Sequence, residues 1–130
     1  MARDDALLPL VVPHTFRFIG LSFLVPGVVS PALPSAFAAP AAYGDLVATI
    51  LAIAAALALF RRAPLAIVLV WLFNIWGASD FLLAYYRGLV TVQLDARMLG
   101  AAFFIPTVFV PAALITHGLI FMLVGPGVSR

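Results

Sequence analysis

The run GDLVATILAIAAALALF (residues 44–60) contains a single charged side chain and ends directly before Arg61 and Arg62. A helix needs about 20 apolar residues to cross a bilayer, and this run approaches that length. Residues 65–86 and 99–124 are apolar runs of the same kind. Only 9% of the residues are charged, against about 25% in a soluble domain. Because so little polar material is available for a surface, we expect the outside of the folded chain to face lipid.

A fourth span precedes these three. Residues 14–29, which follow Pro13, could form it but are short for a crossing. The longer residues 6–29 are favoured, with Asp4 or Asp5 as N-cap and with prolines 13 and 26 as kinks. The Pro- and Ala-rich residues 30–44 are then expected to form a loop. The same region has features of a signal peptide, with an A-x-A pattern at 36–38, but the two early aspartates argue against cleavage.

These spans predict an all-α fold: an antiparallel, up-down bundle of four transmembrane helices in a single domain, residues 1–130. Arginines are expected to be more numerous on the cytoplasmic side. One side carries Arg3, Arg61, Arg62 and Arg130, and the other carries Arg87 and Arg97. We therefore expect both termini in the cytoplasm and the protein in a bacterial inner membrane.

Two ridges of polar and small residues are predicted to meet inside this bundle. Asn74, Gly77 and Asp80 follow one another at i, i+3 and i+6 on the third span. Asp45 and Thr49 stack at i, i+4 on the second span, beside a stripe of alanines that favours close helix packing. The short connection between these spans makes them neighbours. We expect a ligand pocket whose lining residues are Asp45, Thr49, Asn74, Asp80, Trp76 and Tyr85.

Each of these residues also has a purely structural interpretation. Asp45 follows a glycine and could be the N-cap of its helix. Asp80 could act as a hydrogen-bonding strut between helices or pair with Arg87 or Arg97. The aromatic residues could form the ordinary belt at the membrane surface.

The fourth span contains Pro106, Pro111 and His117. Each proline frees a backbone carbonyl four residues earlier, and a freed carbonyl within a membrane needs a partner or a wet cavity. A histidine inside a membrane is a candidate ligand or proton carrier. His117 therefore joins Asp45 and Asp80 as a candidate for acid–base catalysis.

His14, Arg17 and Phe18 share one face of a first helix with α-helical spacing. If His14 and His117 face each other, they could ligate a haem. No other cofactor is predicted, and the sequence contains no metal-ligand spacing. Arg17 is expected to anchor its helix by reaching the lipid headgroups. Nucleic acid is not an expected partner, because the arginines occur singly or in one pair.

The segments PAAYGDLVA, NIWGASDFLLA and FIPTVFVPAALITHG, in this order, resemble small, uncharacterised bacterial multi-pass membrane proteins with four helices. The resemblance covers roughly residues 40–120 and implies no activity. It implies that the marked positions of such a family are Asp45, Asn74, Asp80, Pro106, Pro111 and His117.

Three functions remain open at this point. The first is binding, and transport, of a small apolar or cationic ligand, with Asp80 as the essential group. The second is a structural or accessory subunit that contacts a membrane partner. The third is an enzyme that acts on a lipid or isoprenoid by acid–base chemistry. Four spans enclose little volume, so we expect membrane lipids and a second copy or partner subunit to surround the bundle.

Overall fold

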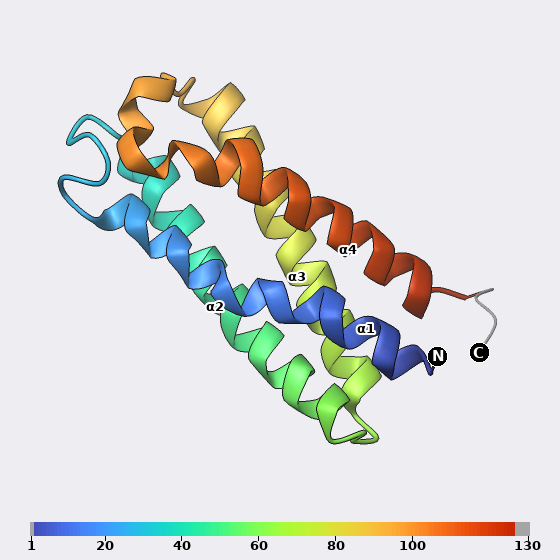
Figure 1. Cartoon of the computed structure of the whole chain (residues 1–130). Coiled ribbons are helices and arrows are strands. Elements are labelled where there is room, and N and C mark those ends of the chain that lie inside the picture. The colour runs from blue at the N-terminus through green and yellow to red at the C-terminus, as the bar shows by residue number, and fades with distance from the viewer. Residues whose placement is uncertain (1, 127–130) are drawn as a thin grey trace.

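The computed structural model describes residues 2–126 as a bundle of four antiparallel spans (Figure 1). The first span consists of α1 (Arg3–Val11) and the 3₁₀ helix η1 (Val12–Leu24), and the second is α2 (Ser35–Phe60). The third consists of α3 (Ala66–Tyr86) and the π-helical turn η2 (Arg87–Thr91). The 3₁₀ helix η3 (Ala96–Phe103) leads into the fourth, which consists of the π-helical turn η4 (Ile105–Phe109) and α4 (Val110–Val124). The predicted all-α fold is confirmed.

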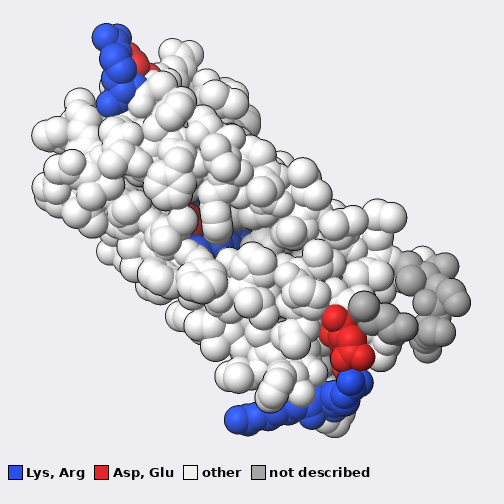
Figure 2. Space-filling model, in the orientation of Figure 1, with Lys and Arg blue, Asp and Glu red and all other residues white. Residues whose placement is uncertain are grey.

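All four spans are long and apolar enough to cross a membrane, as expected of a multi-pass membrane protein. Large apolar side chains such as Leu72, Ile115 and Met122 are more than half exposed along their sides. In Figure 2 the charged side chains lie mainly at the two ends of the molecule, with a band of uncharged surface between them. The start of α1, the end of α4 and the α2–α3 turn share one end (Figure 1). Arg130 lies outside the described residues.

The 3₁₀ helix η1 determines how far the first span reaches and which of its residues are buried. A 3₁₀ helix has 3.0 residues per turn, so residues three apart lie in one row. His14, Arg17, Gly20 and Phe23 form such a row, and all four are buried. The predicted α-helical spacing was wrong here, and Phe18 is 47% exposed. A 3₁₀ helix also rises about 2.0 Å per residue, against about 1.5 Å in an α-helix, so fewer residues cross the bundle.

The second span begins at Ser35, well before the predicted start at residue 44. The predicted loop therefore ends early, and Asp45 lies within the helix rather than at its N-cap. Pro40 is tolerated inside the helix because it removes only the hydrogen bond to the carbonyl of Ala36. Ala36 is exposed.

Both ends of the predicted first span and the start of the predicted fourth also differ. The first helix begins at Arg3, so Asp4 and Asp5 lie in its first turn and neither is its N-cap. The chain leaves the span after Leu24, before Pro26. The predicted fourth span began at residue 99, but Gly100, with a φ of 51°, breaks the helix between residues 96 and 103, and the observed span begins at Ile105.

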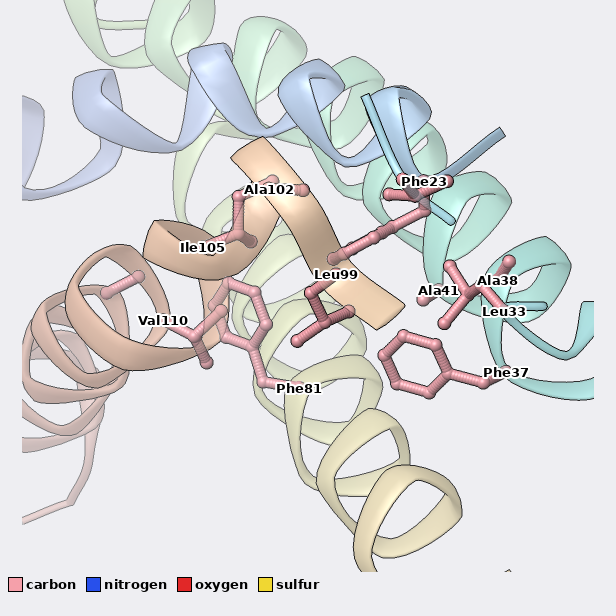
Figure 3. Close-up of a cluster of buried hydrophobic side chains, with 12 residues drawn as sticks. Phe23, Leu33, Phe37, Ala38, Ala41, Phe81, Leu99, Ala102, Ile105 and Val110 are labelled. Atoms are coloured by element: carbon pink, nitrogen blue, oxygen red, sulfur yellow. The ribbon is translucent and has the colours of Figure 1, made fainter. Parts of the chain in front are cut away.

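The buried side chains form two clusters. The compact half, at the end with the start of α1, contains Leu7, Val11, Ala52, Ala55, Val70, Phe73 and Ile120, all 0% exposed. The cavity half, at the opposite end, contains Phe23, Phe37, Phe81, Leu99, Ile105 and Val110 (Figure 3). The polar residues of the interior lie along the chain between these two clusters.

Candidate functional site

One guanidinium links two carboxylates at the junction of the two halves. Arg17, on η1, is 0% exposed. Its Nη2 donates to Asp45 Oδ1 on α2 and to Asp80 Oδ2 on α3, both at 2.9 Å. Its Nε donates to the same Asp45 oxygen at 3.1 Å. Three spans are therefore joined by a single buried side chain, and the group contains two acids for one base.

The remaining contacts of Arg17 complete its surroundings. Nη2 also donates to the carbonyl of Gly77 at 3.3 Å, and Nη1 lies 3.2 Å from Nε2 of His117 on α4. The guanidinium carbon lies 3.6 Å from the centre of the Phe81 ring, a cation–π contact. Arg17 thus has partners in all three other spans.

His117 is fixed as a neutral imidazole by its partners. Asn74 Nδ2 donates to the backbone carbonyl of His117 at 3.1 Å, which leaves Asn74 Oδ1 as an acceptor. The 2.6 Å contact between Oδ1 and His117 Nδ1 therefore requires a proton on Nδ1. Nε2 must then be the acceptor that faces Arg17, because a guanidinium only donates.

His14 is oriented in a similar way. The Thr116 hydroxyl donates to the carbonyl of Ala113 at 2.7 Å, so it accepts from His14 Nε2 at 2.6 Å. His14 Nδ1 is then a buried acceptor that has no hydrogen-bond partner among the described residues. The centres of the His14 and His117 rings are 4.3 Å apart. A haem does not fit between rings in contact, so the haem hypothesis does not suit this arrangement.

Three glycines make room for the buried ionic group. A Cβ on Gly20 would collide with the carboxylate of Asp45, and one on Gly44 would collide with that of Asp80. A Cβ on Gly77 would overlap Arg17 and His117. Each glycine lies on a different span and faces a polar side chain from another span. Close approach between the helices is therefore what brings the charged atoms together.

An apolar cavity of about 270 Å³ adjoins the two carboxylates in the cavity half. All four spans contribute to its wall, and its aromatic lining consists of Phe23, Phe37, Phe81 and Tyr85. Figure 3 shows several of these side chains pointing towards a common centre. Asp45 and Asp80 are the charged residues that line it. In Figure 2, acidic and basic atoms are visible at the bottom of a hollow midway along the apolar face.

A second space, of about 350 Å³, lies over α2 and α3; we call it the outer groove. It is lined by Pro40, Tyr43, Gly44, Val47, Trp76, Ser79, Asp80, Leu83 and Arg87. The indole nitrogen of Trp76 donates to the carbonyl of Gly44 at 3.1 Å and ties the two helices together. Asp80 lines both the cavity and the groove.

The structure brings some of the predicted pocket residues together and separates others. Asp45 and Asp80 share one guanidinium, and Tyr85 lines the cavity, where its hydroxyl donates to the carbonyl of Pro106 at 2.7 Å. Thr49 and Asn74 line neither space; the Thr49 hydroxyl donates to the backbone of Asp45. Trp76 lines the outer groove only. Asp45 and Asp80 therefore form the centre of the candidate site. Thr49 binds the backbone of Asp45, and Asn74 holds His117, which in turn contacts Arg17.

Two interpretations of single charged residues were wrong. Asp80 pairs with Arg17, not with Arg87 or Arg97; Arg97 instead pairs with Asp95 at 2.9 Å. Arg17 does not reach the headgroups, because its side chain is buried and forms charge-assisted hydrogen bonds with Asp45 and Asp80.

Arg17 and the three phenylalanines of the aromatic lining were not predicted as parts of the site. The signal for Arg17 was the spacing of His14, Arg17, Gly20 and Phe23, four residues that fall in one row of a 3₁₀ helix. Phe37 and Phe81 carried no such signal, because phenylalanines occur on both the exposed and the buried faces of these helices.

A protein-family model described as Domain of unknown function (DUF8737) matches residues 1–124. Neither a curated protein nor a solved structure matches the chain.

Proposed function

The chain belongs to the family Domain of unknown function (DUF8737), and we propose that it binds, and transports, a small organic cation with an apolar body. The cation would occupy the cavity beside Asp45 and Asp80, and Asp80 would be its counter-ion. The observation that carries this proposal is the ratio of two carboxylates to one guanidinium at the wall of an apolar cavity.

The excess of acid favours a cationic ligand over a neutral or anionic one. Arg17 balances one carboxylate, and His117 is neutral by its hydrogen bonds. A second proton on buried His14 Nδ1 would have no acceptor among the described residues. A single negative charge then remains when both acids are ionised. An unpaired charge inside a membrane is costly, and a ligand that brings one positive charge removes that cost.

The lining and size of the cavity indicate the class of cation. Aromatic faces attract quaternary ammonium groups, and here they come from Phe23, Phe37 and Tyr85. Pockets for drug-sized ligands have volumes of about 300–1,000 Å³, so about 270 Å³ suits a smaller molecule. Benzyltrimethylammonium, with one ring and one fixed charge, is a suitable probe, and neopentylbenzene has the same shape without the charge.

Calorimetric binding to the purified protein in detergent tests the proposal. We expect benzyltrimethylammonium to bind and neopentylbenzene to bind at least tenfold more weakly. Asp80→Asn should abolish binding of the cation yet keep the fold, because the variant retains one acid for one base. Asp95→Asn is the matched control, since Asp95 is a carboxylate paired with Arg97 outside the four spans. Equal binding of the cation to wild type and Asp80→Asn would contradict the proposal.

A structural role is the second candidate, and the same group of residues favours it. Arg17, Asn74 and His117 are all used in hydrogen bonds between spans. An accessory subunit would need this network only to fix the register of its helices. That role predicts no binding of either probe and co-purification with a larger membrane partner. His117 lines neither the cavity nor the outer groove, which gives the enzyme hypothesis less support.

We further propose a bacterial inner membrane as the location, with both termini in the cytoplasm. The end with the α2–α3 turn carries Arg3, Arg61 and Arg62, and the other end carries Arg87 and Arg97, in agreement with the positive-inside rule. The chain contains no cysteine, so single cysteines report topology cleanly. In intact cells a membrane-impermeant maleimide should label Ser30→Cys and spare Ala63→Cys. The reverse pattern would invert the orientation.

A further inference from the structure

Asp80 can be approached from two separate spaces. It lines the apolar cavity on one side and the outer groove on the other. The two spaces differ in chemistry: apart from its two aspartates the cavity is lined mainly by apolar side chains, whereas the groove also contains Ser79 and Arg87. A carboxylate placed in this way can meet one partner from each side.

We infer that Asp80 exchanges a proton for the organic cation, which enters the cavity while the proton leaves through the outer groove. This inference rests on the proposed function. In the exchange, the O–H bond of the Asp80 carboxyl breaks and the proton passes to a base in water. The carboxylate left behind pairs with the ammonium group. No electrons are transferred, and the charge of the interior is the same before and after.

Asp80 is better suited to this exchange than Asp45. Asp45 accepts two hydrogen bonds from Arg17, from Nε and Nη2, and both fall on one oxygen. Asp80 accepts one from Nη2. Asp45 is 6% exposed and lines only the cavity, whereas Asp80 lines both the cavity and the groove. Protonation of Asp80 therefore weakens fewer hydrogen bonds from Arg17 than protonation of Asp45 would.

The charged and titratable groups around Asp80 support the same assignment. They are Arg17 on η1, Asp45 and Tyr43 on α2, Tyr85 on α3, Arg87 on η2 and His117 on α4. The ring of His14 contacts that of His117. Arg17 stays charged between two acids, and His117 is held neutral by Asn74. Without a ligand, a proton on Asp80 cancels the remaining negative charge.

Calorimetry in two buffers that differ in ionisation enthalpy measures the protons released. Benzyltrimethylammonium has no titratable proton, so any released proton comes from the protein. We expect close to one proton per bound cation at mildly acidic pH and none at alkaline pH. Over the acidic range the affinity should rise about tenfold per pH unit. Cation binding with no proton release at any pH would overturn the exchange and leave the proposed function intact. Absence of binding would overturn the proposed function itself.

The route of the proton is tested by blocking the groove. Ser79 lines the groove and not the cavity, so Ser79→Cys modified with a benzyl methanethiosulfonate should obstruct it. We expect proton release, followed by stopped flow with a pH indicator, to slow at least tenfold while its stoichiometry stays at one. Ser30→Cys with the same modification is the matched control, because Ser30 lies in the loop between η1 and α2. Equal rates in the two modified proteins would overturn the groove as the route.

Discussion

The two halves of the bundle contain the same kinds of apolar residue but pack them in opposite ways. In the compact half, α1, α2, α3 and α4 are regular α-helices, and alanines such as Ala52 and Ala55 are completely buried at their contacts. In the cavity half, three of the four spans become 3₁₀ or π-helical, and Phe23, Phe37 and Phe81 are buried beside the alanines. Small residues allow helices to approach closely, whereas large rings on irregular helices leave a space between them.

This difference shows where the fold can accommodate a ligand. Irregular backbone inside a membrane needs partners for its freed carbonyls. Here the Tyr85 hydroxyl donates to the carbonyl of Pro106, and the Thr107 hydroxyl donates to that of Phe103, each at 2.7 Å. Both side chains also line the cavity. The cavity half therefore satisfies its own backbone and still keeps an open interior, while the ionic group closes it towards the compact half.

The largest expected effect comes from removing the base at this junction. Arg17→Met leaves Asp45 and Asp80 buried side by side without a counter-charge. Loss of one partner from a buried ionic group costs about 3–5 kcal/mol. We expect a large fall in the midpoint of thermal unfolding in detergent, and a loss of the protein from membranes.

The triple variant Arg17→Met/Asp45→Asn/Asp80→Asn separates charge from packing. Neutral amides can bond to each other, so most of the lost stability should return although the guanidinium is still absent. If the triple variant is as unstable as Arg17→Met, the junction is held by the shape of the arginine and not by its charge.

Sequence patterns predicted the spans well because membrane crossing depends on a long apolar run, which any single sequence displays. The acidic pair was also within reach, since Asp45 and Asp80 lie on neighbouring helices joined by a short turn. Their partner was not. Arg17 was placed on the same helix face as His14 but was assigned to the lipid headgroups, whereas the three-residue turns of η1 align it with the buried His14.

The extent of α2 was missed for a different reason. Prolines at 34 and 40 and many alanines resemble a loop, yet an early proline costs a helix only one hydrogen bond near an exposed end. The cavity itself depends on the distances between helices, which no spacing within one helix encodes. Apart from Tyr85, its aromatic lining could therefore be identified only from the folded structure.

One substitution made in both halves tests the comparison most directly, with the smallest expected effect. Ala52→Leu adds volume to a site that is 0% exposed in the compact half, and overpacking of this kind costs about 1–3 kcal/mol. Ala84→Leu adds the same atoms at a residue that lines the cavity. There the new side chain fills empty space, so stability should be unchanged or should rise by up to about 2 kcal/mol. Helix propensity does not separate the two variants, because the exchange is the same on both helices.

Thermal unfolding and benzyltrimethylammonium affinity are measured for both variants. We expect Ala52→Leu to be destabilised but to bind the cation, and Ala84→Leu to be stable but to bind the cation weakly. Equal destabilisation in both would mean that the cavity half is as tightly packed as the compact half, and the cation would then have no room to enter.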